Sequence, residues 1–325
     1  MQLFPKKLSQ IYLVLFVSAF LTITGNFTFF QKTILIYPLS ENWLFLGSLF
    51  FFLFTFLAAL LLLFCYRATT KPILMVLLMI SAIVSYSTNN YGIVFDHNMI
   101  LNTFETDTSE FLDLVSFKSI LYFFIFGLLP SIFVLKVKLK KISFKAQLWE
   151  RIKTFLVLVI IFVIIVLTFS KHYSSFAREN RDLRLYITPT YYLYSATKFV
   201  DSKFATSTKP FKEIGLDAKL NKKSDTRRLV ILVVGETARA DHMSLNGYDR
   251  NTNPYLEKEE IISFDKMTSC GTDTALSVPC MFSLLDRSSY NHAKGKNMSN
   301  VLDIISHAGV SVLWLDNNSS SKSVA

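Results

Sequence analysis

The first half of the chain alternates between long apolar runs and short polar links. Five runs carry no charged residue, and each is long enough for a helix to cross a hydrocarbon core of about 30 Å at roughly 1.5 Å per residue. These runs occupy residues 8–31, 42–66, 72–95, 119–135 and 154–170. The pattern therefore predicts an α-helical membrane domain of five transmembrane helices over residues 1–170.

The first apolar run could instead be a signal peptide, because Lys6 and Lys7 precede it. The run is long, it lacks an obvious cleavage site made of small residues, and further spans follow it. A retained membrane anchor is therefore the preferred interpretation.

The pattern changes after the fifth run. Residues 171–215 are rich in tyrosine, arginine and lysine, which indicates a segment at the membrane interface, although a plain linker is the alternative. Farther on, apolar runs at 229–234 and 310–315 are predicted to be strands that alternate with helices. Such alternation is typical of a parallel sheet, so residues 216–325 are predicted to be the N-terminal part of an α/β catalytic domain.

Positive charge predicts the orientation of the spans. Lysine and arginine concentrate before the first run and in the links at 67–71 and 136–153. The positive-inside rule places these links in the cytoplasm, so the loops at 32–41 and 87–117 and everything after the fifth span face the other side. Most of the formal net charge of +10 is then explained by the lysines and arginines that orient the spans in the membrane. No nucleic acid partner is expected, because anionic lipid headgroups lie nearer to the basic link.

The three cysteines agree with this orientation. Cys270 and Cys280 fall on the predicted external side, where an oxidising compartment permits a disulfide, whereas Cys65 ends the second span at the cytoplasmic face. One bridge between Cys270 and Cys280 is predicted, with two unpaired thiols as the alternative. The bridge would close a small ring and hold the loop between the cysteines rigid.

Candidate chemistry follows the first predicted strand. Glu236 comes one glycine after that strand, so its carboxylate would project from the carboxyl edge of the sheet, where it could bind a metal ion. Capping of the next helix by Glu236 or Thr237 is an equally good reading of the spacing. A second element, at 269–280, places threonine hydroxyls near the start of a short helix, which favours a bound phosphate or a developing alkoxide.

Four motifs make a family resemblance specific. They are GETARADH at 235–242, NGYDRNTNP at 246–254, SCGTDTALSVPCMFS at 269–283 and WLDNNSSSK at 314–322. In this order, and together with the five-span anchor, they closely resemble the phosphoethanolamine transferases that modify lipid A, including the mobile colistin-resistance enzymes. The resemblance implies an alkaline-phosphatase-like catalytic domain on an anchor in the bacterial inner membrane, with the catalytic part in the periplasm.

The resemblance also implies residue roles. Thr274 would be the nucleophile and Glu236 and Thr274 would be zinc ligands, with phosphatidylethanolamine as donor and lipid A as acceptor. The positions that match the phosphoethanolamine pocket and other substrate contacts of the family are Asn102, Thr106, Glu110, Ser319 and Lys322. Three of these, Asn102, Thr106 and Glu110, share one face if their loop is helical. Glu110 would hold the ethanolamine ammonium, and Lys322 suits a phosphate.

The remaining zinc ligands of the family, an Asp-His pair, have no counterpart in this sequence. One carboxylate and one threonine are too few for tetrahedral zinc, which needs about four donors. We therefore expect the chain, read as a C-terminally truncated member of the family, to be inactive by itself or active only with a separately encoded C-terminal fragment. Other readings stay open: a non-catalytic membrane remnant of a disrupted gene, or a transferase with a different periplasmic acceptor or a phosphoglycerol headgroup.

Overall fold

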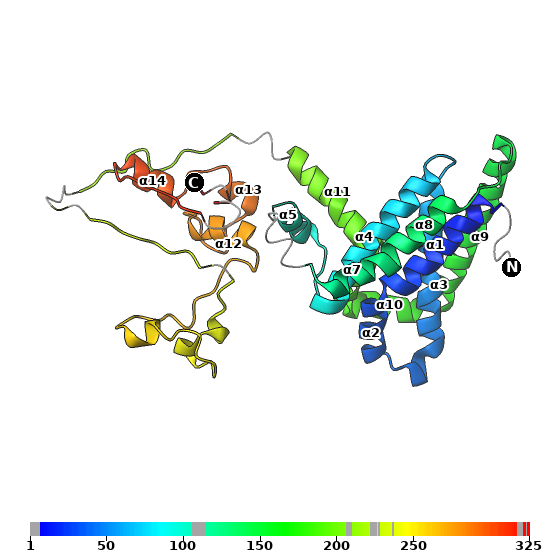
Figure 1. Ribbon diagram of the computed structural model, residues 1–325, viewed down its shortest axis with the longest axis horizontal. Coiled ribbons are helices and arrows are strands. Elements are labelled where there is room, and N and C mark those ends of the chain that lie inside the picture. The colour runs from blue at the N-terminus through cyan, green and yellow to red at the C-terminus, as the bar shows by residue number, and fades with distance from the viewer. Residues whose placement is uncertain are drawn as a thin grey trace. The chain divides into compact units, whose positions relative to one another are not determined.

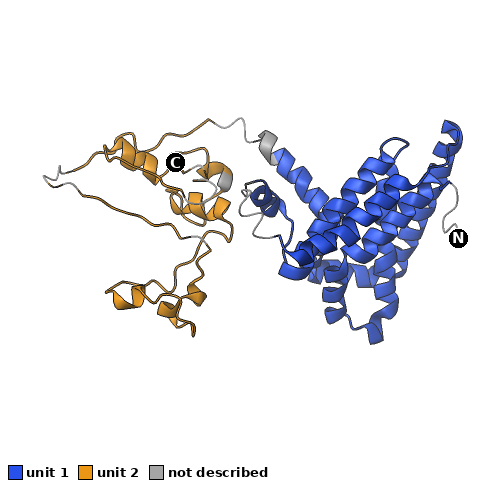
Figure 2. Cartoon of the chain, viewed as in Figure 1, with its two compact units in different colours: residues 1–202 blue, residues 203–325 orange. Residues whose placement is uncertain are grey.

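The computed structural model describes residues 7–105, 115–205, 210–221, 226, 228–235, 237–316, 321–322 and 324–325. The chain divides into two compact units, residues 1–202 and 203–325, which Figure 2 shows in different colours. Each unit has apolar clusters of its own.

The first unit is a bundle of helices (Figure 1). In chain order its elements are α1 (Gln10–Gly25), α2 (Phe27–Ile36), α3 (Leu39–Phe64), α4 (Thr70–Tyr91), α5 (His97–Glu105), α7 (Phe117–Phe123), the π-helix η1 (Phe124–Leu128), α8 (Leu129–Lys136), α9 (Phe144–Thr168), α10 (Ser170–Glu179), the 3₁₀ helix η2 (Arg181–Tyr186) and α11 (Thr190–Ala205).

Four stretches of helix are long and apolar enough to cross a membrane within the described part of the chain. They are Leu39–Phe64, Thr70–Tyr91, Phe117–Lys136 and Phe144–Thr168. Helices α1 and α2 meet at a bend of 58°, and together they pass the same test. The fold thus contains the predicted five spans when the bent pair counts as one. The sequence did not predict the bend, which divides the apolar run at 8–31.

The core of the bundle lies between α1, α3 and α4. Its fully buried side chains include Leu13, Leu74 and Leu78. Helix α9 packs along α3, yet only 6% of its most apolar window is buried. Its outward side chains, such as Ile164 and Leu167, are exposed and apolar, as expected for a helix that faces lipid.

Aromatic side chains attach the segment after the fifth span to the bundle. Phe45 of α3 contacts Tyr173 and Phe176 of α10, with ring centroids 5.6 and 5.8 Å apart. Leu183 of η2 is buried in the same cluster. The residues up to Ser202, most of the stretch expected to be an interfacial segment, therefore belong to the first unit.

A single buried amide joins the bend in the first span to this segment. Asn26 lies between α1 and α2, and its side chain is 2% exposed. Its Nδ2 donates to the carbonyl of Thr188 at 2.9 Å, and its Oδ1 accepts from the Thr188 N–H at 2.9 Å. Nδ2 also lies 3.2 Å from the Leu21 carbonyl, so Asn26 satisfies backbone groups that the helix break leaves unpaired.

The second unit contains short helices joined by long extended segments (Figure 1). In chain order its helices are the 3₁₀ turns η4 (Ala240–His242), η5 (Ser244–Asn246) and η6 (Leu256–Lys258), followed by α12 (Thr274–Met281), α13 (His292–Gly295) and α14 (Val301–His307). An isolated parallel bridge joins Lys212 to Met298, ahead of α14.

The two predicted strands are not paired in this structure. Residues 229–234 and 310–315 lie outside strands, and Leu229, Val230 and Val233 are 85%, 87% and 83% exposed. A strand exists only when its backbone pairs with a neighbour, and no partner pairs with either run among the described residues. Apolar side chains on both faces of 229–234 are nevertheless the pattern of a strand from the middle of a sheet.

Candidate functional site

Thr274 is the first residue of helix α12. Asp273 precedes it as the N-cap, and the Asp273 carboxylate accepts a hydrogen bond from the Leu276 N–H at 3.0 Å. This cap fixes the start of the helix, so the half-buried Thr274 lies where backbone N–H groups are not used within the helix. The helix dipole favours negative charge at this position, which suits a threonine alkoxide or a phosphate.

A disulfide closes the loop that carries Thr274. Cys270 and Cys280 are bonded, with their Cα atoms 6.3 Å apart, while Cys65 of the first unit is a free, buried thiol. The bond ties the segment before Thr274 to the last turn of the helix that Thr274 begins. Within this ring Gly271 packs closely against the Leu276 side chain. A larger residue at position 271 would need that side chain to move, because its Cβ would lie 2.5 Å from the Leu276 Cδ2 atom.

We expect removal of this bond to loosen the loop. Replacement of both Cys270 and Cys280 by serine should lower local stability by about 2–3 kcal/mol, because the unfolded ring is no longer constrained. Faster amide hydrogen exchange over residues 269–276 would report the change. Cys65→Ser, which removes a thiol that forms no disulfide, is the control. Unchanged exchange in the double variant would contradict a constraining role.

A small apolar cluster joins segments that lie in or beside three of the four motifs. Phe282 and Trp314 pack edge to face with ring centroids 5.6 Å apart. Val234, two residues before Glu236, and Val324, two residues after Lys322, belong to the same cluster. Its buried members are Val278, Phe282 and Val324, against which Val234, Leu302 and Trp314 pack. The segments that flank Glu236, Thr274 and Lys322 therefore share one core.

The structure describes some of the predicted site residues and not others. Glu236, Thr106, Glu110 and Ser319 lie outside the described residues. Lys322 is half-buried with a left-handed φ of 54°. Asn102 is half-buried on α5, which packs on α11 through a stacked pair of rings, Phe104 and Phe199, at 5.2 Å. Asn102 belongs to the first unit and Thr274 to the second.

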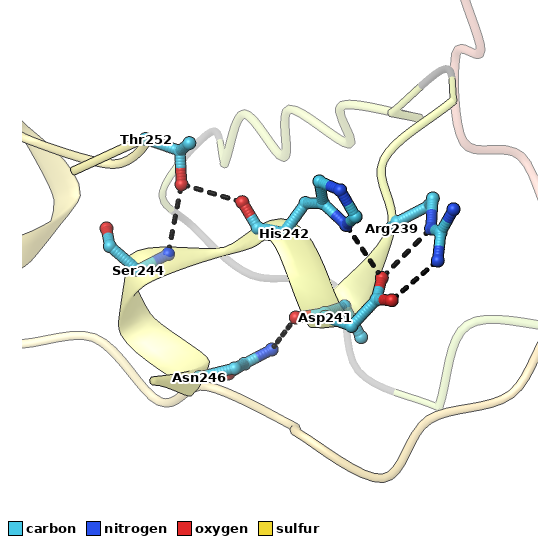
Figure 3. Close-up of polar contacts among 7 residues, drawn as sticks. Arg239, Asp241, His242, Ser244, Asn246 and Thr252 are labelled. Carbon is cyan, nitrogen blue, oxygen red and sulfur yellow. Dashed lines mark hydrogen bonds and ion pairs between the residues drawn. The ribbon is translucent and has the colours of Figure 1, made fainter. Parts of the chain in front are cut away.

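A charged cluster at residues 239–242 was not among the site residues predicted from the sequence. Arg239 donates to Asp241 through Nε at 2.9 Å and through a terminal nitrogen at 2.6 Å, and His242 Nδ1 lies 3.0 Å from the same carboxylate. Figure 3 shows Arg239 and His242 on either side of this carboxylate. Hydrogen bonding from Arg239, and then from His242, holds the pKa of Asp241 well below its usual range. The alternation of Arg, Asp and His in the first motif was the available signal.

Hydrogen bonds extend this cluster into the second motif. The Thr252 hydroxyl donates to the His242 carbonyl at 2.8 Å and accepts from the Ser244 N–H at 3.0 Å (Figure 3). The His242 and Tyr248 rings contact each other in a tilted arrangement, with their centroids 4.8 Å apart. The cluster is exposed to solvent, so it fixes the path of the chain more than it stabilises the fold.

The backbone is strained next to Glu236. Thr237 has a φ of 53°, in the left-handed region that β-branched residues rarely adopt. Such a conformation costs about 1–3 kcal/mol and persists only where the surroundings impose it, which is common at functional sites. The strained residue adjoins the carboxylate that the sequence predicts to bind metal.

The described residues contain no group of three His, Cys, Asp or Glu side chains placed to share a metal ion. Of the two predicted zinc ligands, Thr274 is described and Glu236 is not. The described residues thus do not by themselves form a metal site.

Comparison with known proteins shows which family the chain is similar to. Residues 53–204 match the family model described as phosphoethanolamine transferase EptA/EptB, and residues 228–324 match the sulfatase model. The chain is 40% identical to the phosphatidylethanolamine transferase Mcr-1 of Escherichia coli over 99% of its own length. The chain is similar to members of the phosphoethanolamine transferase family over almost its whole length. The α/β class predicted for residues 216–325 is supported by the match to the sulfatase model. It is not supported by strands, because no strand is paired among the described residues.

Other members of the family agree. Identity to the phosphoethanolamine transferase EptA of Salmonella typhimurium is 31% over 97% of this chain. The solved integral membrane lipooligosaccharide phosphoethanolamine transferase A of Neisseria meningitidis superposes with a TM-score of 0.90 and 31% identity over 98% of this chain. The chain spans 60% of the length of Mcr-1, 58% of EptA from Salmonella and 60% of the Neisseria structure.

Proposed function

We propose that this chain carries the membrane anchor and the nucleophile of an enzyme that transfers phosphoethanolamine from phosphatidylethanolamine to lipid A. The observation that supports the proposal most directly is the place of Thr274, which starts a capped helix inside a disulfide-closed loop. The names of the relatives supply the donor, since Mcr-1 and Mcr-2 are phosphatidylethanolamine transferases. The lipid A acceptor is inferred from the resemblance of the four motifs.

The proposed reaction has two displacements at phosphorus. First, the Thr274 Oγ forms a bond to phosphorus as the bond between phosphorus and the glycerol oxygen breaks, and the hydroxyl proton ends on the departing diacylglycerol. The oxygen of an O–H group of lipid A then forms a bond to the same phosphorus as the bond between phosphorus and the Thr274 Oγ breaks, and the proton of that O–H group restores the Thr274 hydroxyl. The N-terminus of α12 stabilises the charge that develops on the threonine oxygen and the phosphoryl group.

The substrate contacts are proposals of the same kind. Lys322 is a point charge for the phosphate, and Ser319 precedes it in the same motif. Asn102, Thr106 and Glu110 would bind the phosphoethanolamine headgroup, with the Glu110 carboxylate on the ammonium. Zinc is the proposed cofactor, with Glu236 and Thr274 as its ligands in this chain.

A transfer assay tests the function. Membranes containing the 325-residue chain, alone or continued in frame by the C-terminal part of Mcr-1, receive phosphatidylethanolamine labelled in the ethanolamine. We expect label on lipid A, and a labelled peptide containing Thr274, only with the continued chain, because two proposed ligands are too few for zinc. Transfer by the 325-residue chain alone would contradict the argument from ligand number. No transfer by the folded chimaera would contradict the proposed function.

We also propose that the protein lies in the bacterial inner membrane with residues 171–325 in the periplasm. The basic link at 136–153 supports this orientation through the positive-inside rule. Alkaline phosphatase fused after Ala325 should be active, and the same reporter fused at Lys141 should be inactive. The reverse pattern of activities would overturn the orientation.

A further inference from the structure

One end of the first unit contains two arginines without a neutralising carboxylate. Arg67 lies in the turn between α3 and α4, and Arg151 lies on α9. Among the described residues, the ion pairs involve Arg178, Arg239 and His242, and neither Arg67 nor Arg151 contacts Asp or Glu. Arg67 is exposed and Arg151 is half-buried, so a partner from outside the bundle can reach them.

Both guanidinium groups gather around one aromatic ring. The Cζ atoms of Arg67 and Arg151 lie 5.6 and 5.3 Å from the centroid of Tyr66. Arg67 also lies 5.5 Å from the ring of Phe144, at the start of α9. The Tyr66 hydroxyl oxygen is buried and has no hydrogen-bond partner among the described residues. Tyr66 therefore has both guanidinium groups close to its ring.

A network of hydrogen bonds through buried glutamine side chains fixes the two arginines. Arg67 Nε donates to the Gln147 Oε1 at 3.2 Å, and Arg151 donates to the carbonyl of Cys65. Gln147 in turn donates to Gln10, whose own Nε2 donates to the Cys65 carbonyl at 2.9 Å. Gln10 and Gln147 are only 7% and 8% exposed. This network fixes the position of the guanidinium groups while each retains N–H donors for another acceptor.

We propose that Arg67 and Arg151 bind the phosphodiester of an anionic phospholipid such as phosphatidylglycerol. The planar fork of arginine matches two oxygens of one phosphate, and the weak hydration of guanidinium suits a site at the edge of the hydrocarbon. This inference concerns residues of the first unit and does not rest on the chemistry proposed for Thr274.

A lipid fits this site better than a free anion. Leu148, Ile152 and Leu156 follow one another at four-residue spacing on α9 and are 42%, 42% and 52% exposed, so they form an apolar stripe for an acyl chain. The basic link reaches the same end, because Leu8 N donates to the Lys138 carbonyl at 3.0 Å and Lys140 N donates to the Leu8 carbonyl at 2.9 Å. Clustered cations next to a span attract anionic leaflets.

Lipid binding to the full 325-residue chain tests the proposal. The protein is reconstituted in nanodiscs of phosphatidylcholine with increasing phosphatidylglycerol, and bound lipid is counted by native mass spectrometry. Arg67→Gln and Arg151→Gln should each weaken phosphatidylglycerol binding about fivefold, and the double variant about thirtyfold. The control, Arg178→Gln with Arg181→Gln, removes the same charge elsewhere in the unit and should retain the affinity.

Three outcomes would overturn the proposal. The first is unchanged affinity in the folded double variant, and the second is an equal loss in the control, which would indicate general attraction by charge. The third is displacement of the lipid by millimolar inorganic phosphate, which would indicate a site for the free anion. If the double glutamine variant does not fold, the double lysine variant, Arg67→Lys with Arg151→Lys, tests the proposal instead. It keeps the charge but loses the fork, so several-fold weaker binding supports the proposal and full affinity refutes it.

Discussion

Replacement of Thr274 by alanine should abolish transfer in the chain continued by the C-terminal part of Mcr-1. Removal of an enzyme's nucleophile costs at least about a thousandfold in rate, because nothing else can form the covalent intermediate. The measurement is the rate at which labelled phosphoethanolamine reaches lipid A, together with a search for the labelled Thr274 peptide. Both signals should fall below detection.

Thr272 provides the matched control for this experiment. It lies in the same disulfide-closed loop, two residues earlier, and is exposed to solvent. Thr272→Ala should therefore leave the rate within a few-fold of the parent enzyme, because the helix cap and the disulfide remain. If transfer survives Thr274→Ala and is lost in Thr272→Ala, the nucleophile has been assigned to the wrong threonine.

Glu236→Gln should remove both bound zinc and transfer from the same continued chain. Glutamine keeps the size of the side chain but replaces the carboxylate, a zinc ligand, with a neutral amide. Metal content measured by mass spectrometry should fall to the background level, and the rate should fall at least about a hundredfold. Glu257→Gln, at an exposed carboxylate in η6, is the control and should change neither quantity. Full zinc content in Glu236→Gln would remove Glu236 from the ligand set.

The membrane unit was predictable because bilayer thickness alone sets the length of an apolar run. Four spans agree with the predicted runs within a few residues at most ends, and the fifth is the bent pair. The bend itself gave no such signal, because the run at 8–31 contains no proline and no charge. It depends on Asn26, whose hydrogen-bond partner Thr188 is 162 residues away in the sequence.

In the second unit the site residues were easier to predict from the sequence than the fold. Its motifs were sufficient to predict the family resemblance and the candidate catalytic residues. The cap at Asp273 was also predictable, because aspartate is a preferred residue at the start of a helix. The strand at 229–234 was predicted from a local apolar pattern, but strand pairing depends on other segments, and none pairs with it here among the described residues. The contacts of Asp241 with Arg239 and His242 depend on a tight turn that residue spacing does not reveal.

The Asn26 contact also has a consequence for how the protein is made. The first span enters the membrane with a primary amide that, in the finished fold, is satisfied by the backbone of Thr188. At about 5–20 residues per second, roughly ten to thirty seconds of synthesis separate the two residues. During that interval the bend at Asn26 has no clamp, and the first span has to rely on water, lipid headgroups or the insertion machinery to satisfy its amide. The membrane unit can therefore complete its fold only after the segment that contains Thr188 has been synthesised.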